Sequence, residues 1–130
     1  MNKELVICII VMASIVIISF LLEQYTIEVV DEMDKKLEDI KEIFVEKEEN
    51  KKENINEKMD EIMNTWREEY KKLAFFIEHD ELEKVETELT SMQAYIQVEE
   101  YEEAVPSLEK SIFILKHIKE KFKLNLKNVF

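Results

Sequence analysis

The side chains of this sequence that are able to bind a metal ion are two histidines, His79 and His117, and many carboxylates. Helical di-iron proteins use a Glu-x-x-His motif, which places both ligands on one face of a helix. The nearest arrangement here is His117-x-x-Glu120, which has the reverse order and is not repeated. We therefore expect no metal site and no cofactor.

His79 and two acidic residues that follow it, Asp80 and Glu83, are better explained by helix ends. The pattern predicts that Asp80 caps a new helix and that Glu83, three residues later, completes a capping box. His79 is expected to hydrogen-bond to the carbonyls that end the preceding helix, or to a carboxylate across the turn. Because acidic neighbours favour the imidazolium form, a pH-sensitive hinge at His79 is an alternative.

Nucleophiles and paired carboxylates do not fall into a catalytic pattern. Ser91, Ser107 and Ser111 lie on predicted helix surfaces or near a predicted cap. Glutamates such as Glu68 and Glu69 are adjacent, so they point to different sides of a helix and do not act on one substrate atom. The sequence therefore predicts a protein that is not an enzyme.

The composition is that of an all-α protein. Charged residues make up 37% of the chain, there is no glycine, and Pro106 is the single proline. Without glycine there is no phosphate-binding loop, no Rossmann fingerprint and no GxxxG helix-packing motif. The net charge of −12 argues against nucleic acid, because phosphates repel an acidic protein. Only the lysine-rich end after residue 115 is suited to contact an anionic membrane surface.

Residues 1–22 are predicted to form a signal-anchor transmembrane helix. Leu5 to Leu22 is a run of 18 residues without a charge. At 1.5 Å per residue such a helix is ~27 Å long, close to the ~30 Å hydrocarbon core of a bilayer. The residues after it offer no small-x-small cleavage site, and the lone cysteine, Cys8, lies in no lipobox. A cleaved signal peptide and a buried core helix are the alternatives.

The charges that flank this run predict its orientation. The N-terminal flank carries the α-amine and Lys3, whereas the other flank has no cation before Lys35. By the positive-inside rule, the N-terminus lies in the cytoplasm and the soluble part lies outside it. We therefore expect a single-pass protein of the cell membrane with an extracytoplasmic domain.

Residues 23–49 are predicted to form a juxtamembrane helix that continues the anchor into water. Its apolar residues recur in steps of three and four, at Val30, Met33, Leu37, Ile40 and Phe44. Such a stripe packs against other helices of the same chain, or forms a short homodimeric coiled coil. The stripe is shorter than a clear coiled coil requires, so both interpretations stay open.

Residues 50–130 are predicted to form an acidic helical domain with a short basic C-terminal tail. A solvated break precedes it, with Asn50 as the expected cap of the juxtamembrane helix. The apolar periodicity then predicts three helices: about Asn54 to Ile77, Asp80 to a weak break at Val98–Tyr101, and Tyr101 to about Lys121 with a kink at Pro106. The residues from Phe122 to Phe130 alternate between apolar and polar, which predicts an extended tail. The fold class is thus a transmembrane helix that continues into a helical hairpin or bundle of about three further helices.

Four aromatic residues at the end of the second soluble helix form the candidate partner-docking site: Trp66, Tyr70, Phe75 and Phe76. Trp66 lies in the apolar stripe, where a tryptophan more often fills a core than binds a ligand. Phe75 falls beside the stripe, which favours a position on the surface. Burial of Phe75 against the juxtamembrane helix is the alternative.

A set of positions spread over the soluble part resembles a known family: Trp66, Phe76-Ile77, His79, Glu81, Leu89, Tyr95, Ala104, Leu108, Leu115, His117-Ile118 and Asn128-Val129-Phe130. Behind one N-terminal anchor, this pattern resembles the uncharacterised bacterial family catalogued as domain of unknown function 4363. The resemblance implies a short single-pass membrane protein, of a kind found chiefly in spore-forming anaerobes, with no assigned reaction, cofactor or catalytic residue. Members are often encoded beside polytopic membrane proteins, which implies an accessory role.

From the residues and this resemblance together, we expect a membrane-anchored helical interaction protein that is an accessory subunit of a larger membrane protein. Its expected partners are the membrane, through Leu5 to Leu22, and a protein such as a polytopic membrane protein. A homodimeric membrane-proximal coiled-coil scaffold is an alternative function, and a ligand-sensing helical domain is a third.

Overall fold

The structure, a computed structural model, describes residues 2–45 and 51–129, the last six of them as backbone alone. These residues form four helices and no strand: α1 (Lys3–Val45), α2 (Lys51–Leu73), α3 (His79–Gln97) and α4 (Tyr101–Val129). The prediction of an all-α chain with three helices after the first is therefore confirmed. The expected helix cap at Asn50 lies outside the described residues.

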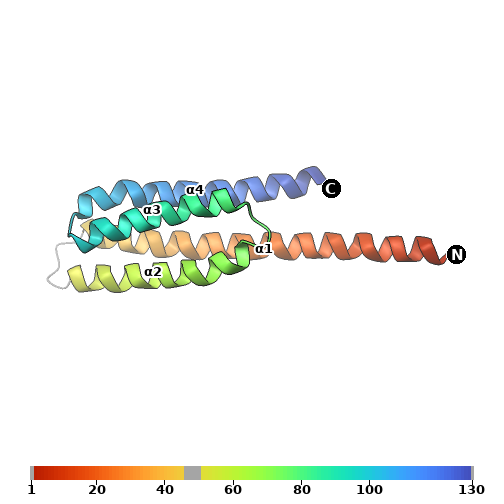
Figure 1. Cartoon of the computed structure of the whole chain (residues 1–130), viewed down its shortest axis with the longest axis horizontal. Coiled ribbons are helices and arrows are strands. Elements are labelled where there is room, and N and C mark those ends of the chain that lie inside the picture. The colour runs from red at the N-terminus through yellow and green to blue at the C-terminus, as the bar shows by residue number, and fades with distance from the viewer. Residues whose placement is uncertain (1, 46–50, 130) are drawn as a thin grey trace.

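The helices form an up-down-up-down bundle to which α1 contributes only its second half (Figure 1). α1 packs against α2 and α4, and α3 packs against the same two helices, so that the four surround one core. The first half of α1 projects beyond the bundle by itself, and the end of α4 runs in the same direction (Figure 1).

α1 is one uninterrupted helix of 43 residues that passes through two different surroundings. Its first part has a mean hydropathy of 3.2 and none of it is buried. This part is long and apolar enough to cross a membrane, and a signal sequence has the same two properties. From Thr26 onward the helix enters the bundle, where Met33, Leu37 and Ile40 are 0% exposed. The domain boundary predicted near residue 22 therefore falls inside one helix, at the point where its unburied apolar part gives way to the part packed in the bundle.

The core is filled by apolar side chains that recur in steps of three and four on all four helices. Burying one side chain of this size stabilises a fold by about 1.5–3 kcal/mol relative to leaving it exposed. The fully buried large side chains are Trp66, Met33, Leu37, Ile40, Ile55, Ile62, Leu82, Leu89, Met92, Leu108, Leu115 and Val30. The juxtamembrane stripe thus packs within its own chain.

α2 begins earlier and ends earlier than predicted, at Lys51 and Leu73 instead of Asn54 and Ile77. After Leu73 the chain forms a tight turn, in which the N–H of Ala74 donates to the carbonyl of Tyr70 at 2.9 Å and that of Ile77 to Leu73 at 2.9 Å. These bonds satisfy the last carbonyls of the helix. The turn therefore continues the apolar spacing of α2 without continuing the helix.

The capping box predicted at the start of α3 is wrong. α3 begins at His79, and Glu78 occupies the N-cap position without a side-chain hydrogen bond to the helix. Asp80 lies inside the first turn, where its negative charge still interacts favourably with the helix N-terminus. The acidic residues mark the correct end of the helix, but the helix starts before Asp80.

α3 ends in a Schellman motif that is built without glycine. The N–H of Glu100 donates to the carbonyl of Tyr95 at 2.9 Å, and the N–H of Glu99 donates to that of Ile96 at 3.1 Å. Glu99 has a φ of 60°, in the left-handed region that glycine occupies most easily. The weak break predicted before Tyr101 is therefore a defined helix stop.

The extended tail predicted after Phe122 is wrong, because α4 continues to Val129. Ile118, Phe122 and Leu126 are spaced four apart in the sequence, which is a helical period, and this spacing outweighs the short alternation of Leu124 and Leu126. Pro106 lies inside α4, where it removes one hydrogen bond of the helix.

Candidate functional site

The turn between α2 and α3 lies at the end of the bundle from which the first half of α1 emerges (Figure 1). We call this end the anchor-side tip and define it by four residues: Lys71 and Lys72 in the last turn of α2, Phe75 in the turn, and Lys123 on α4. All four side chains are exposed, and Phe75 is 90% exposed.

An aromatic cluster holds the α2–α3 turn against α1 and α4. The ring of Phe76 contacts that of Tyr25 edge to face, with the centroids 6.2 Å apart, and that of Phe122 with the centroids 5.7 Å apart. The Tyr25 hydroxyl donates a hydrogen bond to the Glu69 carboxylate of α2. Burial, followed by this hydrogen bond, raises the pKa of Tyr25. The turn is thereby fixed beside the place where α1 enters the bundle.

The four aromatic residues predicted to dock a partner do not form one surface. Trp66 is 0% exposed, so it fills the core and is removed from the candidate set. Phe76 is half-buried in the cluster with Tyr25, and Tyr70 is half-buried with its ring edge-on to Trp66. Phe75 alone projects into solvent, and the predicted alternative of its burial against α1 is wrong.

His79 lies between Tyr70 and Glu83 and bonds to both. Its Nε2 is 2.9 Å from a carboxylate oxygen of Glu83, and its Nδ1 is 3.0 Å from the Tyr70 hydroxyl. A neutral imidazole that donates from Nε2 and accepts at Nδ1 satisfies both contacts. The observed partners are neither the carbonyls that end the preceding helix nor a carboxylate across the turn, because Glu83 lies four residues later on the same helix and Tyr70 contributes a hydroxyl. The pH-sensitive hinge stays a prediction.

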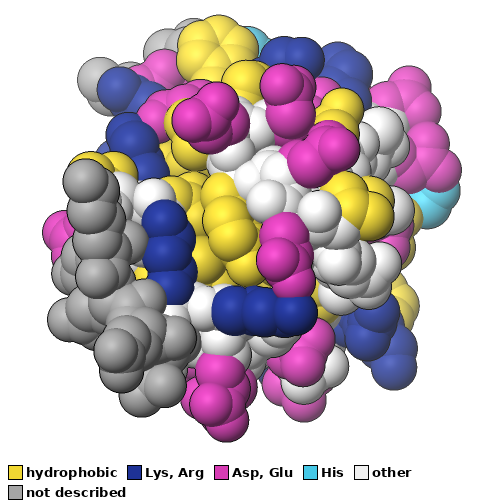
Figure 2. Space-filling model, turned by 90° about the vertical axis from the view of Figure 1, so that its left-hand side faces the viewer, with side chains coloured by type: hydrophobic (Ala, Val, Ile, Leu, Met, Phe, Trp, Pro, Cys, Tyr) yellow, Lys and Arg dark blue, Asp and Glu magenta, His cyan; other side chains and the backbone are white. Residues whose placement is uncertain are grey.

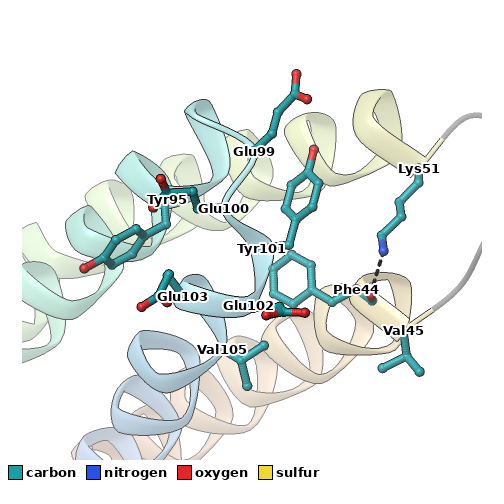
Figure 3. A pocket seen from close by; sticks show the side chains of 10 residues that line it. All are labelled: Phe44, Val45, Lys51, Tyr95, Glu99, Glu100, Tyr101, Glu102, Glu103 and Val105. Carbon is teal, nitrogen blue, oxygen red and sulfur yellow. Dashed lines mark hydrogen bonds between the residues drawn. The ribbon is translucent and has the colours of Figure 1, made fainter.

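At the opposite end of the bundle the structure contains a hollow of about 860 Å³, which we call the distal groove. Its aromatic lining comes from Phe44 at the end of α1, Tyr95 on α3 and Tyr101 at the start of α4. Phe44 and Tyr101 stack with their centroids 5.9 Å apart, and Figure 3 shows the two rings side by side. Figure 2, which faces this end of the molecule, shows hydrophobic side chains gathered at its centre with charged side chains around them.

The charges around the distal groove are mostly negative. Glu100, Glu102 and Glu103 line it with exposed carboxylates that form no ion pair within the part of the chain that the structure describes. The lining cation, Lys51, is already engaged: its ammonium donates to the carbonyl of Phe44 at 2.6 Å and lies 5.6 Å from the centroid of the Tyr101 ring (Figure 3). Among the described residues, the groove therefore offers aromatic faces together with carboxylates that form no ion pair.

The groove residues were not predicted to form a site, and a further exposed ring, Phe113, which is 71% exposed on α4, was not predicted either. Phe113 was detectable, since it lies one position off the stripe of Ile112 and Leu115. The groove was not, because Phe44, Tyr95 and Tyr101 are brought together by three different helices.

A half-buried carboxyl, Asp34, lies between α1 and α4. Burial and the nearby charge of Asp31 raise the pKa of Asp34 to about 6, although Lys119 opposes the shift. Its Oδ1 is buried without a hydrogen-bond partner among the described residues, as is Nε1 of Trp66. Both atoms lack the partners that such groups usually find in a core.

Across residues 2–45 and 51–129, no group of three or more His, Cys, Asp or Glu side chains is placed to hold a metal ion. The bundle thus presents the distal groove at one end and the anchor-side tip at the other, where the apolar half of α1 leaves it (Figure 1).

Comparison with known proteins identifies one family. The family model described as Domain of unknown function (DUF4363) matches residues 20–129, which cover the end of the apolar run and the entire bundle. No curated protein and no solved structure matches the chain.

Proposed function

The chain belongs to the family described as domain of unknown function DUF4363, and from that premise we propose that it is a membrane-anchored interaction protein. It acts as an accessory subunit of a larger membrane protein, by contact and without catalysis. Its first helix holds it in the membrane, and its bundle presents a surface to the partner.

One observation carries this proposal, namely the continuity of α1. No residue of its apolar part is buried within the described chain, and its second part forms one side of the bundle core. A helix that leaves an uncharged, mostly apolar run of 18 residues unburied is unfavourable in water and is stabilised by a hydrocarbon environment. A signal peptide would be cut away from this core within an unbroken helix, only a few residues before the buried Thr26. A retained anchor agrees better with this geometry.

The orientation that we propose places the bundle outside the cytoplasm. Lys3 precedes the apolar run, and the flank that follows it carries Glu23 and Glu28 before any cation. The positive-inside rule then keeps the N-terminus in the cytoplasm.

The surface that we propose for the protein partner is the distal groove. Its aromatic lining supplies apolar area, and Glu100, Glu102 and Glu103, which form no ion pair among the described residues, favour a basic segment. Leu22 and Phe44 are 22 residues apart on one helix, so the groove lies ~33 Å from the end of the apolar run. The partner must therefore expose a basic segment at about this height above the membrane.

The proposal is tested by purifying the full-length chain from native membranes in a mild detergent and identifying the membrane proteins that remain bound. The double variant Glu102→Lys/Glu103→Lys reverses two charges of the groove, and it should lose a bound protein that the wild type retains. The matched control, Asp60→Lys/Glu68→Lys, reverses two exposed charges on α2 and should retain it. Equal binding by both double variants would contradict the assignment of the groove.

The alternative of a homodimeric coiled-coil scaffold requires the stripe of α1, and Met33, Leu37 and Ile40 of that stripe are 0% exposed in the bundle of a single chain. A zipper through these residues would have to open the core first.

The ligand-sensing alternative would use the same distal groove, and a small cationic compound that raises the melting temperature of the wild type would favour it.

A further inference from the structure

The anchor-side tip combines an exposed aromatic ring with exposed lysines. Phe75 is 90% exposed at the apex of a turn whose next residue, Phe76, packs inward on Tyr25. The ammonium groups of Lys71 and Lys72 lie one turn earlier, exposed and without an ion pair in the described part of the chain. An exposed ring between cations is typical of residues that lie in the interface of a bilayer.

The height of the tip relative to the apolar run can be derived from α1. Tyr25 is three residues after Leu22, which corresponds to ~4.5 Å along the helix axis. The ring of Phe76 contacts Tyr25, so the turn lies at about this level. The polar layer of a bilayer extends about 5–8 Å beyond its hydrocarbon core on each side. A membrane that surrounds the apolar run therefore reaches the turn.

α4 brings a further cation to the same level. Phe122 contacts Phe76, so Lys123, the next residue, lies beside the tip and is exposed. Two acidic side chains at the start of α3 are engaged by another lysine, because Lys121 lies 3.4 Å from Glu78 and 3.6 Å from Glu81. The backbone of α4 then continues to Val129 in the direction of the apolar part of α1 (Figure 1). Lys71, Lys72 and Lys123, which form no ion pair among the described side chains, are available to lipid phosphates.

We propose that the anchor-side tip is a second membrane contact, in which Phe75 enters the headgroup layer and Lys71, Lys72 and Lys123 bind the phosphates of anionic lipids. This inference rests on the proposed anchor and extends it. With α1 alone the bundle is tethered at one point, whereas with the tip it stands on the membrane at two. The contact fixes the side of the bundle that faces the bilayer and keeps the distal groove turned away from it.

The test uses the full-length chain in vesicles of phosphatidylcholine mixed with phosphatidylglycerol. In a Cys8→Ser background, a nitroxide label is attached at Phe75→Cys, or at Val98→Cys, which is 63% exposed on the distal turn and serves as the matched control. The rate of collision with a water-soluble nickel complex should be severalfold lower at position 75 than at position 98. In the same vesicles, Lys71→Gln/Lys72→Gln should raise the rate at position 75, whereas Lys35→Gln/Lys110→Gln, which alters two exposed lysines elsewhere, should leave it unchanged.

The outcomes separate this inference from the proposed anchor. If the labelled chain floats with the vesicles but position 75 is as accessible as position 98, the tip contact is overturned and the anchor stands. If the chain does not float with the vesicles, the anchor is overturned and the tip contact falls with it. Lower accessibility at position 75 in phosphatidylcholine alone, unaffected by either lysine pair, would overturn the part played by the lysines.

Discussion

The hydroxyl of Tyr25 donates a hydrogen bond to the carboxylate of Glu69, and this bond connects the point where α1 enters the bundle to the last turns of α2. It is the polar part of a contact whose apolar part is the ring of Phe76. Together they couple the orientation of the apolar half of α1 to the orientation of the bundle.

Removing that hydroxyl should weaken the bundle. We expect Tyr25→Phe to lower the free energy of unfolding by about 1.5–3 kcal/mol, the range for a hydrogen bond to a charged group. The measurement is thermal or urea unfolding of the full-length chain in detergent micelles, followed by circular dichroism. Tyr95→Phe is the matched control, since Tyr95 is also half-buried and its hydroxyl has no hydrogen bond within the described residues. Equal losses in the two variants would contradict this role of the bond.

Asp34 should make stability depend on pH. Its folded pKa of about 6 lies above its ordinary value of 3.8, so the folded state binds more protons and stability falls as pH rises through this interval. Asp34→Asn should therefore stabilise the chain at pH 8, by on the order of 1 kcal/mol for a half-exposed group. The gain should shrink as pH falls and disappear below the ordinary pKa of 3.8. Unfolding curves across this range, with Asp60→Asn on the surface of α2 as the control, provide the check. A gain that is the same at both ends of the range would refute the titration of Asp34.

Trp66 and Phe75 should behave in opposite ways, although both belong to the aromatic set that the sequence predicts. Trp66→Ala leaves a cavity at a fully buried position and should cost about 3–5 kcal/mol. Phe75→Ala removes a side chain that is 90% exposed and should change stability by less than about 0.5 kcal/mol. Unfolding measurements on both variants in micelles decide this, and a large loss for Phe75→Ala would mean that the turn is packed differently.

Replacing Glu99 by glycine should stabilise the protein. Its φ of 60° raises the conformational free energy of a residue with a side chain by about 1–2 kcal/mol, and glycine avoids this strain because it has no Cβ. Glu99→Gly should raise the free energy of unfolding by about 1 kcal/mol, because the exposed ion pair with Lys52 that it loses contributes little. Glu100→Gly is the control, since Glu100 has no positive φ, and it should give no gain. A loss of stability in Glu99→Gly would show that the ion pair outweighs the backbone strain.

Self-association through the α1 stripe is tested with a single cysteine. In a Cys8→Ser background, Leu37→Cys places a thiol at a position that is 0% exposed, and we expect few crosslinked dimers at native abundance. Val45→Cys, on the same helix and 80% exposed, reports how often two chains meet at random. More crosslinking at position 37 than at position 45 would support the homodimeric scaffold.

Most of the fold was predictable because the helices carry long apolar stripes. The residues of α1 from Val30 to Ile40 repeat in steps of three and four, and no glycine interrupts any element. The ends of elements were harder to predict. At the start of α3 three consecutive residues, Glu78, His79 and Asp80, are acceptable near a helix N-terminus, and packing selects among them. At the end of α4, a few alternating residues gave a strand-like period by chance.

The candidate site was predictable only in part, because exposure depends on neighbours that are distant in the sequence. The aromatic residues around Phe75 were found from their spacing, but which of them faces solvent depends on Tyr25 and Phe122. The distal groove needs the ends of three helices to meet, and no local pattern encodes that.

The ammonium of Lys119 on α4 donates to Asp31 of α1 at 2.8 Å, across 88 residues of sequence. α1 precedes α4 in the chain, so α1 is synthesised before the helix that covers one of its sides. At about 5–20 residues per second, the residues between Ile40 and Tyr101 take several seconds to be added, whereas a helix forms in about a microsecond. During synthesis α1 thus exists for several seconds before α4 covers its apolar stripe. Under the anchor that we propose, the apolar half of α1 is available to the bilayer before the bundle closes.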